Sequence, residues 1–179
     1  MPLACLPVPI AGRNRMMRYL AIKSIEDDPA WQGGEYTKEP IEGLRTAAEL
    51  TFVMGSAPFY LQKIAPTKQA AEDYIDDYMA KRLPPLDAND LIYYYDASRN
   101  YDPSAHLDWI KVPVMWLNSA DDYINPPELG IAEKYAPKLA HGKFVLIPIS
   151  DATRGHGTHT QAAVWKDYLV ELLNESAKK

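Results

Sequence analysis

The chain has 179 residues, of which 47% are hydrophobic and 24% are charged, and its formal net charge is −5. This profile is typical of a globular protein with a well-packed core, and the length gives no case for two full domains. Nucleic-acid binding requires a basic surface, so an acidic chain of this kind predicts no nucleic-acid partner.

The cysteine content and the apolar segments bear on the compartment. The single cysteine, Cys5, excludes an internal disulfide and suits a reducing environment, so we expect a cytoplasmic protein. The longest apolar stretch, residues 2–12, contains three prolines and is too short to span a bilayer. It also lacks the charged n-region of a signal peptide. We therefore expect no membrane partner.

Taken in chain order, the sequence opens with an apolar run at residues 3–6. The run is expected to be a core strand that leads directly into a loop at residue 12, without a polar leader before it. Natural termini usually lie at the surface, so this opening predicts that the chain begins inside a domain. An edge strand at a true terminus is the alternative.

Residues 13–110 are predicted to be helix and loop throughout, because no stretch in them alternates with a period of two. Four helices are expected: 14–28, 41–54, 68–83 and a short one after Asp87, which suits an N-cap. The apolar spacing places the following residues on their inward faces: Met17, Leu20, Ala21 and Ile25; Ile41, Leu44, Ala48 and Phe52; Ala71, Tyr74, Ile75, Tyr78 and Met79; Leu91, Tyr94 and Tyr95.

From residue 111 onward the pattern changes to strand, helix (127–139), strand and helix (160–174). The two strands are expected within 111–120 and 143–150, as bounded apolar runs of the kind that form fully buried parallel strands. The predicted fold class is therefore α/β, with a few parallel strands, flanking helices and a helical block inserted ahead of them.

Residues suited to catalysis follow the ends of both predicted strands. Asp121 and Asp122 follow the first strand, and His156 follows the second between two glycines. Because a right-handed crossover brings the carboxyl ends of parallel strands to one sheet edge, the two loops are expected to meet. Alone, an aspartate here would be a turn former and a histidine an ordinary loop residue. Together, Asp122 and His156 predict the acid and the base of a catalytic triad.

A second histidine and a metal site are the alternatives at this edge. His159 competes for the role of base, but it is expected in the first turn of the last helix, whereas the glycines around His156 give it a flexible setting. A metal site made of His156, His159 and Asp122 lacks the spacing of a known zinc pattern. We expect no metal and no resident cofactor.

The sequence does not contain the Gly-x-Ser-x-Gly elbow that would present a serine nucleophile. Ser56, in Gly55-Ser56-Ala57, is the nearest fragment, but its place before Pro58 is better explained as the end of a helix. Cys5 is a nucleophile only by elimination and is expected to be a buried thiol. The residues present therefore predict an acid and a base without their nucleophile.

Several segments together resemble the homoserine O-acetyltransferase group of α/β-hydrolase-fold acyltransferases. They are Gly-Arg-Asn-Arg-Met at 12–16, Asp-Pro-Ala-Trp-Gln-Gly-Gly at 28–34, Asn-Ser-Ala-Asp-Asp at 118–122 and Gly-His at 155–156. The match covers essentially the whole chain but only the C-terminal portion of the family's length. The resemblance thus implies the C-terminal half of an α/β-hydrolase fold.

The resemblance also implies a domain division and site roles. Residues 1–12 would hold the core strand that follows the nucleophile elbow and a loop, 13–110 the helical lid or cap, and 111–179 the C-terminal β-α-β-α of the hydrolase core. Asp122 matches the family's acid and His156 its base, while the family's serine would lie upstream of Met1.

The substrate site matches less well. Where the family's arginine for the substrate carboxylate is expected, this chain has Ile22 and Lys23, with Arg18 one turn away. In the complete family the serine takes an acyl group from acyl-CoA and passes it to a hydroxyl, and an ester hydrolase would need the same residues. The resemblance implies acyl transfer by a chain that is inactive alone, with acyl-CoA as co-substrate in the transferase case.

The alternative is a non-catalytic oligomeric or binding module of the same ancestry. A half sheet exposes an edge and an apolar face. In either case we therefore expect a homo-oligomer or a complex with an N-terminal half.

Overall fold

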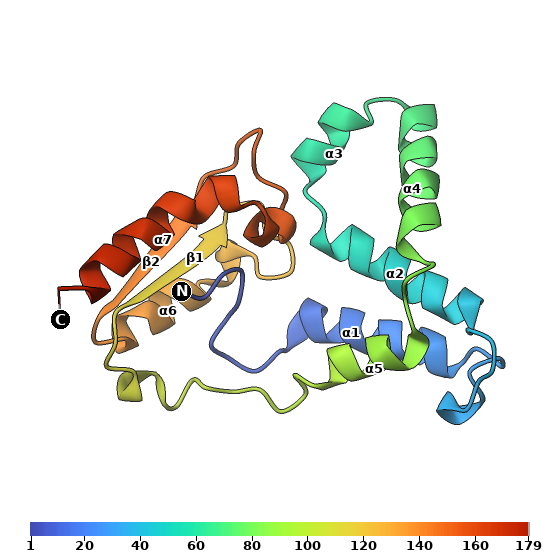
Figure 1. The fold of residues 1–179 in the computed structure, drawn as a ribbon, viewed down its shortest axis with the longest axis horizontal. Helices are drawn as coiled ribbons and strands as arrows, with labels where there is room; N and C mark the ends of the chain where they lie inside the picture. Colours follow the sequence, from blue (N-terminus) through green and yellow to red (C-terminus); the bar gives the residue numbers. More distant parts are fainter. Residues whose placement is uncertain (179) are drawn as a thin grey trace. The chain divides into compact units, whose positions relative to one another are not determined.

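The computed structural model describes residues 1–178, which form two compact units (Figure 1). The strand unit contains Met1–Pro9, Gly55–Tyr60 and the residues from Asp102 onward, and the helical unit contains Ile10–Met54 and Leu61–Tyr101. No helix of residues 1–178 is long and apolar enough to cross a membrane.

The centre of the strand unit is a pair of parallel strands, β1 (Val114–Ser119) and β2 (Gly142–Ile147). Their register places Val114 opposite Gly142 and Ser119 opposite Ile147, so both strands end at the same level. The predicted parallel pair is therefore confirmed. Its carboxyl end carries the loops on which the candidate site depends.

Alternation along β1 divides its side chains between two helices. Met115 and Leu117 pack with Leu172 of α7 (Ala162–Ser176). Trp116 faces the other way and, with Phe144 of β2, lies beside α6 (Ile131–Tyr135) across a small hollow. Figure 1 shows α7 and α6 on opposite sides of the strands. Burial on both faces explains why β1 reads as a continuous apolar run.

Two expectations about this sheet were wrong in part. Of β2 only Ile147 is buried, because no second strand lies on its outer side in the described residues, so it is a half-buried edge strand. The opening run 3–6 makes a single parallel bridge, from Leu3 to Leu117, rather than a strand. Ala4, at φ 49°, turns the backbone out of the extended conformation after that bridge.

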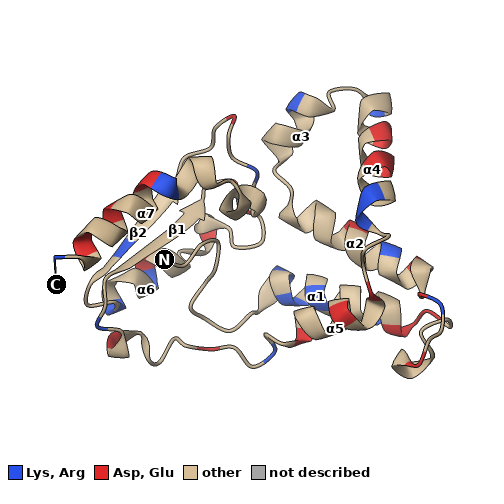
Figure 2. Ribbon diagram, viewed as in Figure 1, with Lys and Arg blue, Asp and Glu red and all other residues tan. Residues whose placement is uncertain are grey.

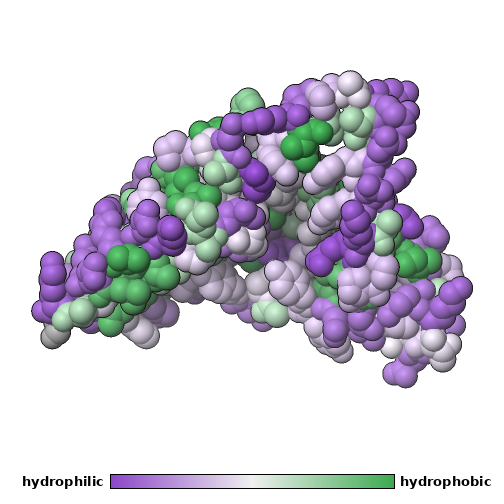
Figure 3. Space-filling model, turned by 45° about the horizontal axis from the view of Figure 1, so that its top comes forward, coloured by the Kyte–Doolittle hydropathy of each residue, from purple (hydrophilic) through white to green (hydrophobic). Residues whose placement is uncertain are grey.

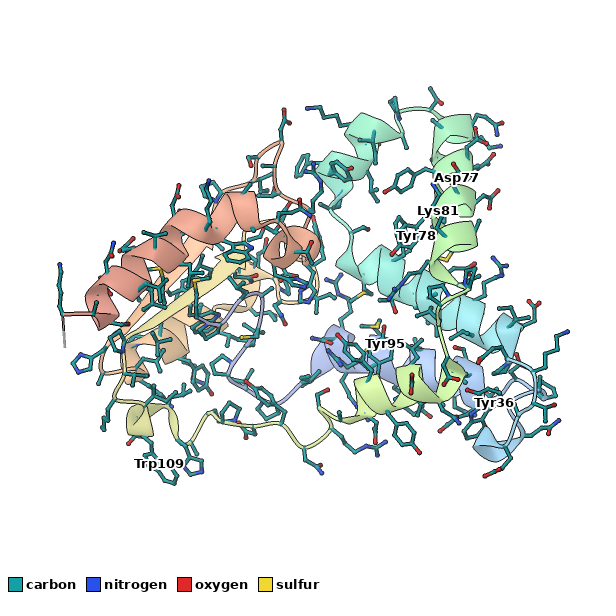
Figure 4. All side chains as sticks on the ribbon, in the orientation of Figure 1. Tyr36, Asp77, Tyr78, Lys81, Tyr95 and Trp109 are labelled. Atoms are coloured by element: carbon teal, nitrogen blue, oxygen red, sulfur yellow. The ribbon has the colours of Figure 1, made fainter. Side chains whose placement is uncertain are left out.

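The helix predicted over 127–139 is broken into short pieces. They are a 3₁₀ turn at Pro127–Leu129, helix α6, and a second 3₁₀ turn at Ala136–Lys138. Gly130, at φ 63°, separates the first two, and the proline at position 137 cannot supply the N–H that a continuous helix would need there. A further 3₁₀ turn, Leu107–Trp109, precedes β1, and Trp109 is exposed (Figure 4).

The helical unit contains no strand in its described residues, as the missing period of two predicted. Its helices α1 (Gly12–Glu26), α4 (Lys68–Arg82) and α5 (Ala88–Asp96) fall close to the predicted bounds. Helix α2 (Ile41–Gly55) ends where the chain passes into the strand unit. Within α3 (Pro58–Ile64) the chain passes back into the helical unit. Helix α3 was not predicted, because Pro58 was taken as the end of a helix instead of the start of one.

The inward faces of the helices were mostly placed correctly. Met17, Ala21 and Ile25 are buried in α1, but Leu20 is half exposed and Ile22 takes its place, because the buried arc lies on the other side of Met17. Three further residues predicted to face inward, Ile41, Ala71 and Tyr94, are exposed.

The fourth predicted helix has the predicted cap. The side chain of Asp87 accepts a hydrogen bond from the N–H of Asp90 at 2.9 Å. Tyr95 is buried in this unit (Figure 4), and the Arg18 guanidinium lies 5.5 Å from its ring centroid. The outward face of α4 is acidic, as expected, and Figure 2 shows the carboxylates gathered along it.

Candidate active site

Asp122 lies in the loop that follows β1, here called the acid loop (residues 120–125). Its side chain is buried, and its Oδ1 accepts hydrogen bonds from the N–H groups of Ile124 at 2.8 Å and Asn125 at 3.1 Å. Two backbone donors offset the cost of burying a carboxylate and fix its orientation. Asp122 is thus a turn former, and its second oxygen remains available to a partner.

That partner is His156, in the loop after β2, here called the base loop (residues 154–158). Its Nδ1 lies 3.0 Å from Oδ2 and 3.2 Å from Oδ1 of Asp122. Residues 34 positions apart in the sequence therefore meet at the carboxyl end of the parallel pair. The two loops lie together where the sequence predicted.

The geometry of the pair determines what the imidazole can do. Because Nδ1 faces an acceptor-only carboxylate, the proton of a neutral ring belongs on Nδ1, and Nε2 carries the free lone pair. Within residues 1–178, Nε2 has no hydrogen-bond partner, and 26% of the side chain is exposed. The pair can therefore accept a proton at Nε2 while the carboxylate stabilises the resulting imidazolium.

Gly155 allows the base loop to turn tightly beside a neighbouring segment. At φ 61° it has a backbone conformation that suits glycine, and a Cβ there would lie 3.1 Å from the backbone of Gly55 and Ser56. These residues belong to the linker segment (residues 55–60), all of which lies in the strand unit. A second contact joins the same two segments, because the Arg154 guanidinium lies 3.7 Å from the ring centroid of Tyr60.

The other predicted residues of this edge have different surroundings. Asp121 is buried and accepts a hydrogen bond from the Ser119 hydroxyl. His159 lies in a 3₁₀ turn, Gly157–Thr160, that precedes α7, and so not in the last helix as expected. Its Nδ1 is bonded to the carbonyl oxygen of His156, and the two rings meet edge to face at 5.2 Å. His159 contacts the base but not the acid.

The nucleophile candidates remain weak. Burial raises the pKa of the Cys5 thiol, which opposes formation of the thiolate that would react. Ser56 immediately follows α2, and the atoms placed next to Gly155 are those of its backbone. No group of three metal-binding side chains occurs in the part of the chain that the structure describes.

Three polar residues near the pair were not identified from the sequence. They are Ser119 and Asn125, which support the acid loop, and Thr158 in the base loop, all of them buried. Asn125 donates from its amide to the carbonyl oxygen of Ala4 at 2.7 Å. A signal was available, since short polar residues at the end of an otherwise apolar strand, or next to a predicted base, indicate buried hydrogen bonding.

The fold matches several solved structures over nearly the whole of this chain. A homoserine O-acetyltransferase from Bacillus anthracis matches with a TM-score of 0.79 at 20% identity, over 96% of this chain and 52% of that one. An acetylester hydrolase from Corynebacterium glutamicum matches with a TM-score of 0.80 at 20% identity, over 97% and 53%. The acetyl esterase MekB matches with a TM-score of 0.77 at 21% identity, over 96% and 53%.

These likenesses show that the chain has about half of an α/β-hydrolase fold, as the sequence predicted. The chain spans about half the length of the solved structures that it matches. No protein-family model matches the sequence, and neither does any curated protein. At 20% identity the relationship establishes the fold and leaves the chemistry to be inferred from the site.

Proposed function

We propose that Asp122 and His156 are the acid and the base of an acyl-transfer site whose serine nucleophile comes from outside these 179 residues. The observation that carries the proposal is the buried carboxylate 3.0 Å from Nδ1 of a partly exposed imidazole, with Nε2 free of partners among the described residues. In such a site Nε2 takes the proton of the serine hydroxyl as the serine attacks the acyl carbon. It then gives that proton to the leaving group, while the aspartate holds the ring.

The substrate class follows from the solved structures of similar fold. One is a homoserine O-acetyltransferase and others are acetyl esterases, and their names share the acetyl group. The proposed reaction is therefore transfer of a short acyl group from an ester or thioester to a hydroxyl or to water, with acyl-CoA as donor in the transferase case. The helical unit would serve as the lid over the substrate. The single cysteine supports a reducing, cytoplasmic location.

The chain alone is expected to turn over no ester above background. Without a serine nucleophile, only the weak rate that comes from binding would remain. The assay is p-nitrophenyl acetate hydrolysis by the purified chain, compared with Ser56→Ala and Cys5→Ala variants. Clear activity that disappears in one of these variants would identify a nucleophile within the chain and overturn this form of the proposal.

The positive test supplies the missing part. The complemented protein would be this chain with an N-terminal α/β-hydrolase half, carrying Gly-x-Ser-x-Gly, fused ahead of Met1. It should hydrolyse p-nitrophenyl acetate, and an acetyl-CoA assay with homoserine would separate the transferase from the hydrolase. A folded complemented protein whose serine reacts with a fluorophosphonate probe but whose hydrolysis does not depend on His156 would refute the proposal.

The alternative is a non-catalytic module that acts through association. Exposed apolar side chains on the strand unit favour it, and Figure 3 shows apolar patches on this surface. The exposed apolar side chains include Val170 and Leu173 of α7, which are 54% and 58% exposed. Either a second copy or an N-terminal half would cover such a surface. Sedimentation velocity at micromolar concentration would reveal a homo-oligomer, and a compact monomer without dye-binding apolar surface would exclude self-association.

A further inference from the structure

A line of hydrogen bonds runs from the base loop to the end of β1. The backbone N–H of Arg154 donates to the Thr158 hydroxyl at 2.8 Å. The Thr158 hydroxyl donates to that of Ser119 at 3.3 Å, and the Ser119 hydroxyl donates to Oδ1 of Asp121. These three hydrogen bonds, here called the relay, all donate in the same direction along the line, which ends at the Asp121 carboxylate.

The relay lies in the interior of the strand unit. Ser119, Asp121 and Thr158 are each 3% exposed. A buried carboxylate and two buried hydroxyls would be costly if they were unpaired, and their cost is offset only while the chain of bonds is complete. Bonds that all point toward one anion also strengthen one another in a medium of low dielectric constant.

The ends of the relay coincide with the two halves of the proposed site. Arg154 and Thr158 stand two residues before and two residues after His156, so their bond closes the base loop across the residue that carries the imidazole. Asp121 directly precedes Asp122 in the acid loop. The relay therefore links the backbone that carries the base to the backbone that carries the acid, independently of the contact between the two side chains.

We propose that Thr158, Ser119 and Asp121 are positioning residues that hold the His156 ring on Asp122. This inference rests on the proposed function, because it takes the pair as acid and base. Asp121, which the sequence explained only as part of a turn, acquires a specific role as the terminal acceptor that orients both hydroxyls. Thr158 sets the position of the base loop, since it is the only side chain of the relay that belongs to that loop.

The test uses the complete chain and does not depend on activity. Nitrogen-15 labelling of histidine would report the tautomer of His156 by NMR, and amide exchange would report the N–H of Arg154. The wild type should carry its neutral-ring proton on Nδ1. Thr158→Val removes the hydroxyl at nearly constant volume, so the Arg154 amide should exchange about five- to ten-fold faster, the equivalent of one hydrogen bond. The His156 ring should then sample both tautomers.

Two further variants make the result specific. Thr158→Ser keeps the hydroxyl and should behave like the wild type. Thr160→Val is the matched control: the Thr160 hydroxyl also bonds the backbone of the base loop, donating to the carbonyl oxygen of Gly157 at 2.8 Å, but Thr160 is exposed and lies outside the relay. If Thr158→Val leaves the Arg154 exchange and the His156 tautomer unchanged, or if Thr160→Val has the same effect, the relay does not position the base.

Ser119→Ala gives a second measurement should Thr158→Val fail to fold. It interrupts the relay at its middle, and it should also speed the Arg154 exchange and mix the tautomers of His156. Asp122→Asn tests the proposed function separately. In this variant the neutral His156 ring should no longer be held with its proton on Nδ1, while the Arg154 amide should exchange as in the wild type. A tautomer insensitive to Asp122→Asn would overturn the acid–base pair, whereas an Arg154 amide insensitive to Ser119→Ala would overturn the relay.

Discussion

Replacement of Gly155 by alanine would test how closely the base loop packs on the linker segment. An L-residue at φ 61° costs roughly 1–2 kcal/mol. The new Cβ would also lie 3.1 Å from backbone atoms of Gly55 and Ser56, which cannot rotate away. Overpacking of this kind costs about 1–3 kcal/mol, so the total expected loss in the free energy of unfolding is about 2–5 kcal/mol.

Gly130 provides a matched control within the same unit. It has φ 63°, but a Cβ there would meet no atom within 4 Å. Gly130→Ala should therefore cost only the conformational part, roughly 1–2 kcal/mol. The difference between the two variants isolates the contact between the base loop and the linker segment, and it should be about 1–3 kcal/mol.

The assay is urea unfolding followed by tryptophan fluorescence. Of the four tryptophans, Trp109, Trp116 and Trp165 belong to the strand unit, so the signal reports mainly the unit that contains both glycines. If Gly155→Ala and Gly130→Ala lower the free energy of unfolding equally, the linker segment does not pack on the base loop. The described position of the loop would then be refuted.

Three further predictions concern packing and pH. Gly43→Ala should destabilise the helical unit by about 1–3 kcal/mol in urea unfolding, because its Cβ would lie 2.3 Å from the carbonyl oxygen of Ser24; an unchanged midpoint would contradict this. Hydrogen bonds, foremost that from the Gly43 N–H, hold the pKa of Asp28 below its ordinary value. The Asp28 carboxylate therefore contributes its full stabilisation of the fold above its ordinary pKa, and this contribution is lost as the pH falls through its lowered pKa. In a series of thermal unfolding curves at different pH, Asp28→Asn should weaken the dependence of stability on pH at the acid end. Tyr60→Leu should cost about 0.5–1 kcal/mol through loss of the contact with Arg154, and Tyr60→Phe should cost less; equal losses would argue against a cation–π contact.

The sequence predicted most of what local pattern controls. The change from helical periodicity to bounded apolar runs located β1 and β2, and Asp87 marked the start of α5. The pairing of Asp122 with His156 was predictable because the topology of parallel strands fixes where their carboxyl ends meet. That inference needed only the order of the elements and no knowledge of packing.

What the sequence missed depends on tertiary context. Strand β2 is partly exposed because no further strand of the described residues lies on its outer side, and local pattern does not reveal whether a strand has a neighbour. The exposure of Tyr94 beside buried Tyr95 depends on which arc of α5 meets α1. The relay through Thr158 could not be foreseen, because a threonine hydroxyl has many short-range partners and only the fold brings Ser119 to it.

The measurement that tests the central claim most directly is kcat for single substitutions in the complemented protein. His156→Ala should reduce p-nitrophenyl acetate hydrolysis to background, and Asp122→Asn should lower kcat on the order of 10⁴-fold, because the imidazole loses its correct tautomer and its stabilising charge. His159→Ala and Asp121→Asn should cost far less, since His159 does not contact the acid and an amide oxygen can still accept from Ser119. The assignment of acid and base would be contradicted if His159→Ala abolished hydrolysis while His156→Ala lowered kcat only slightly, or if both aspartate variants kept full activity.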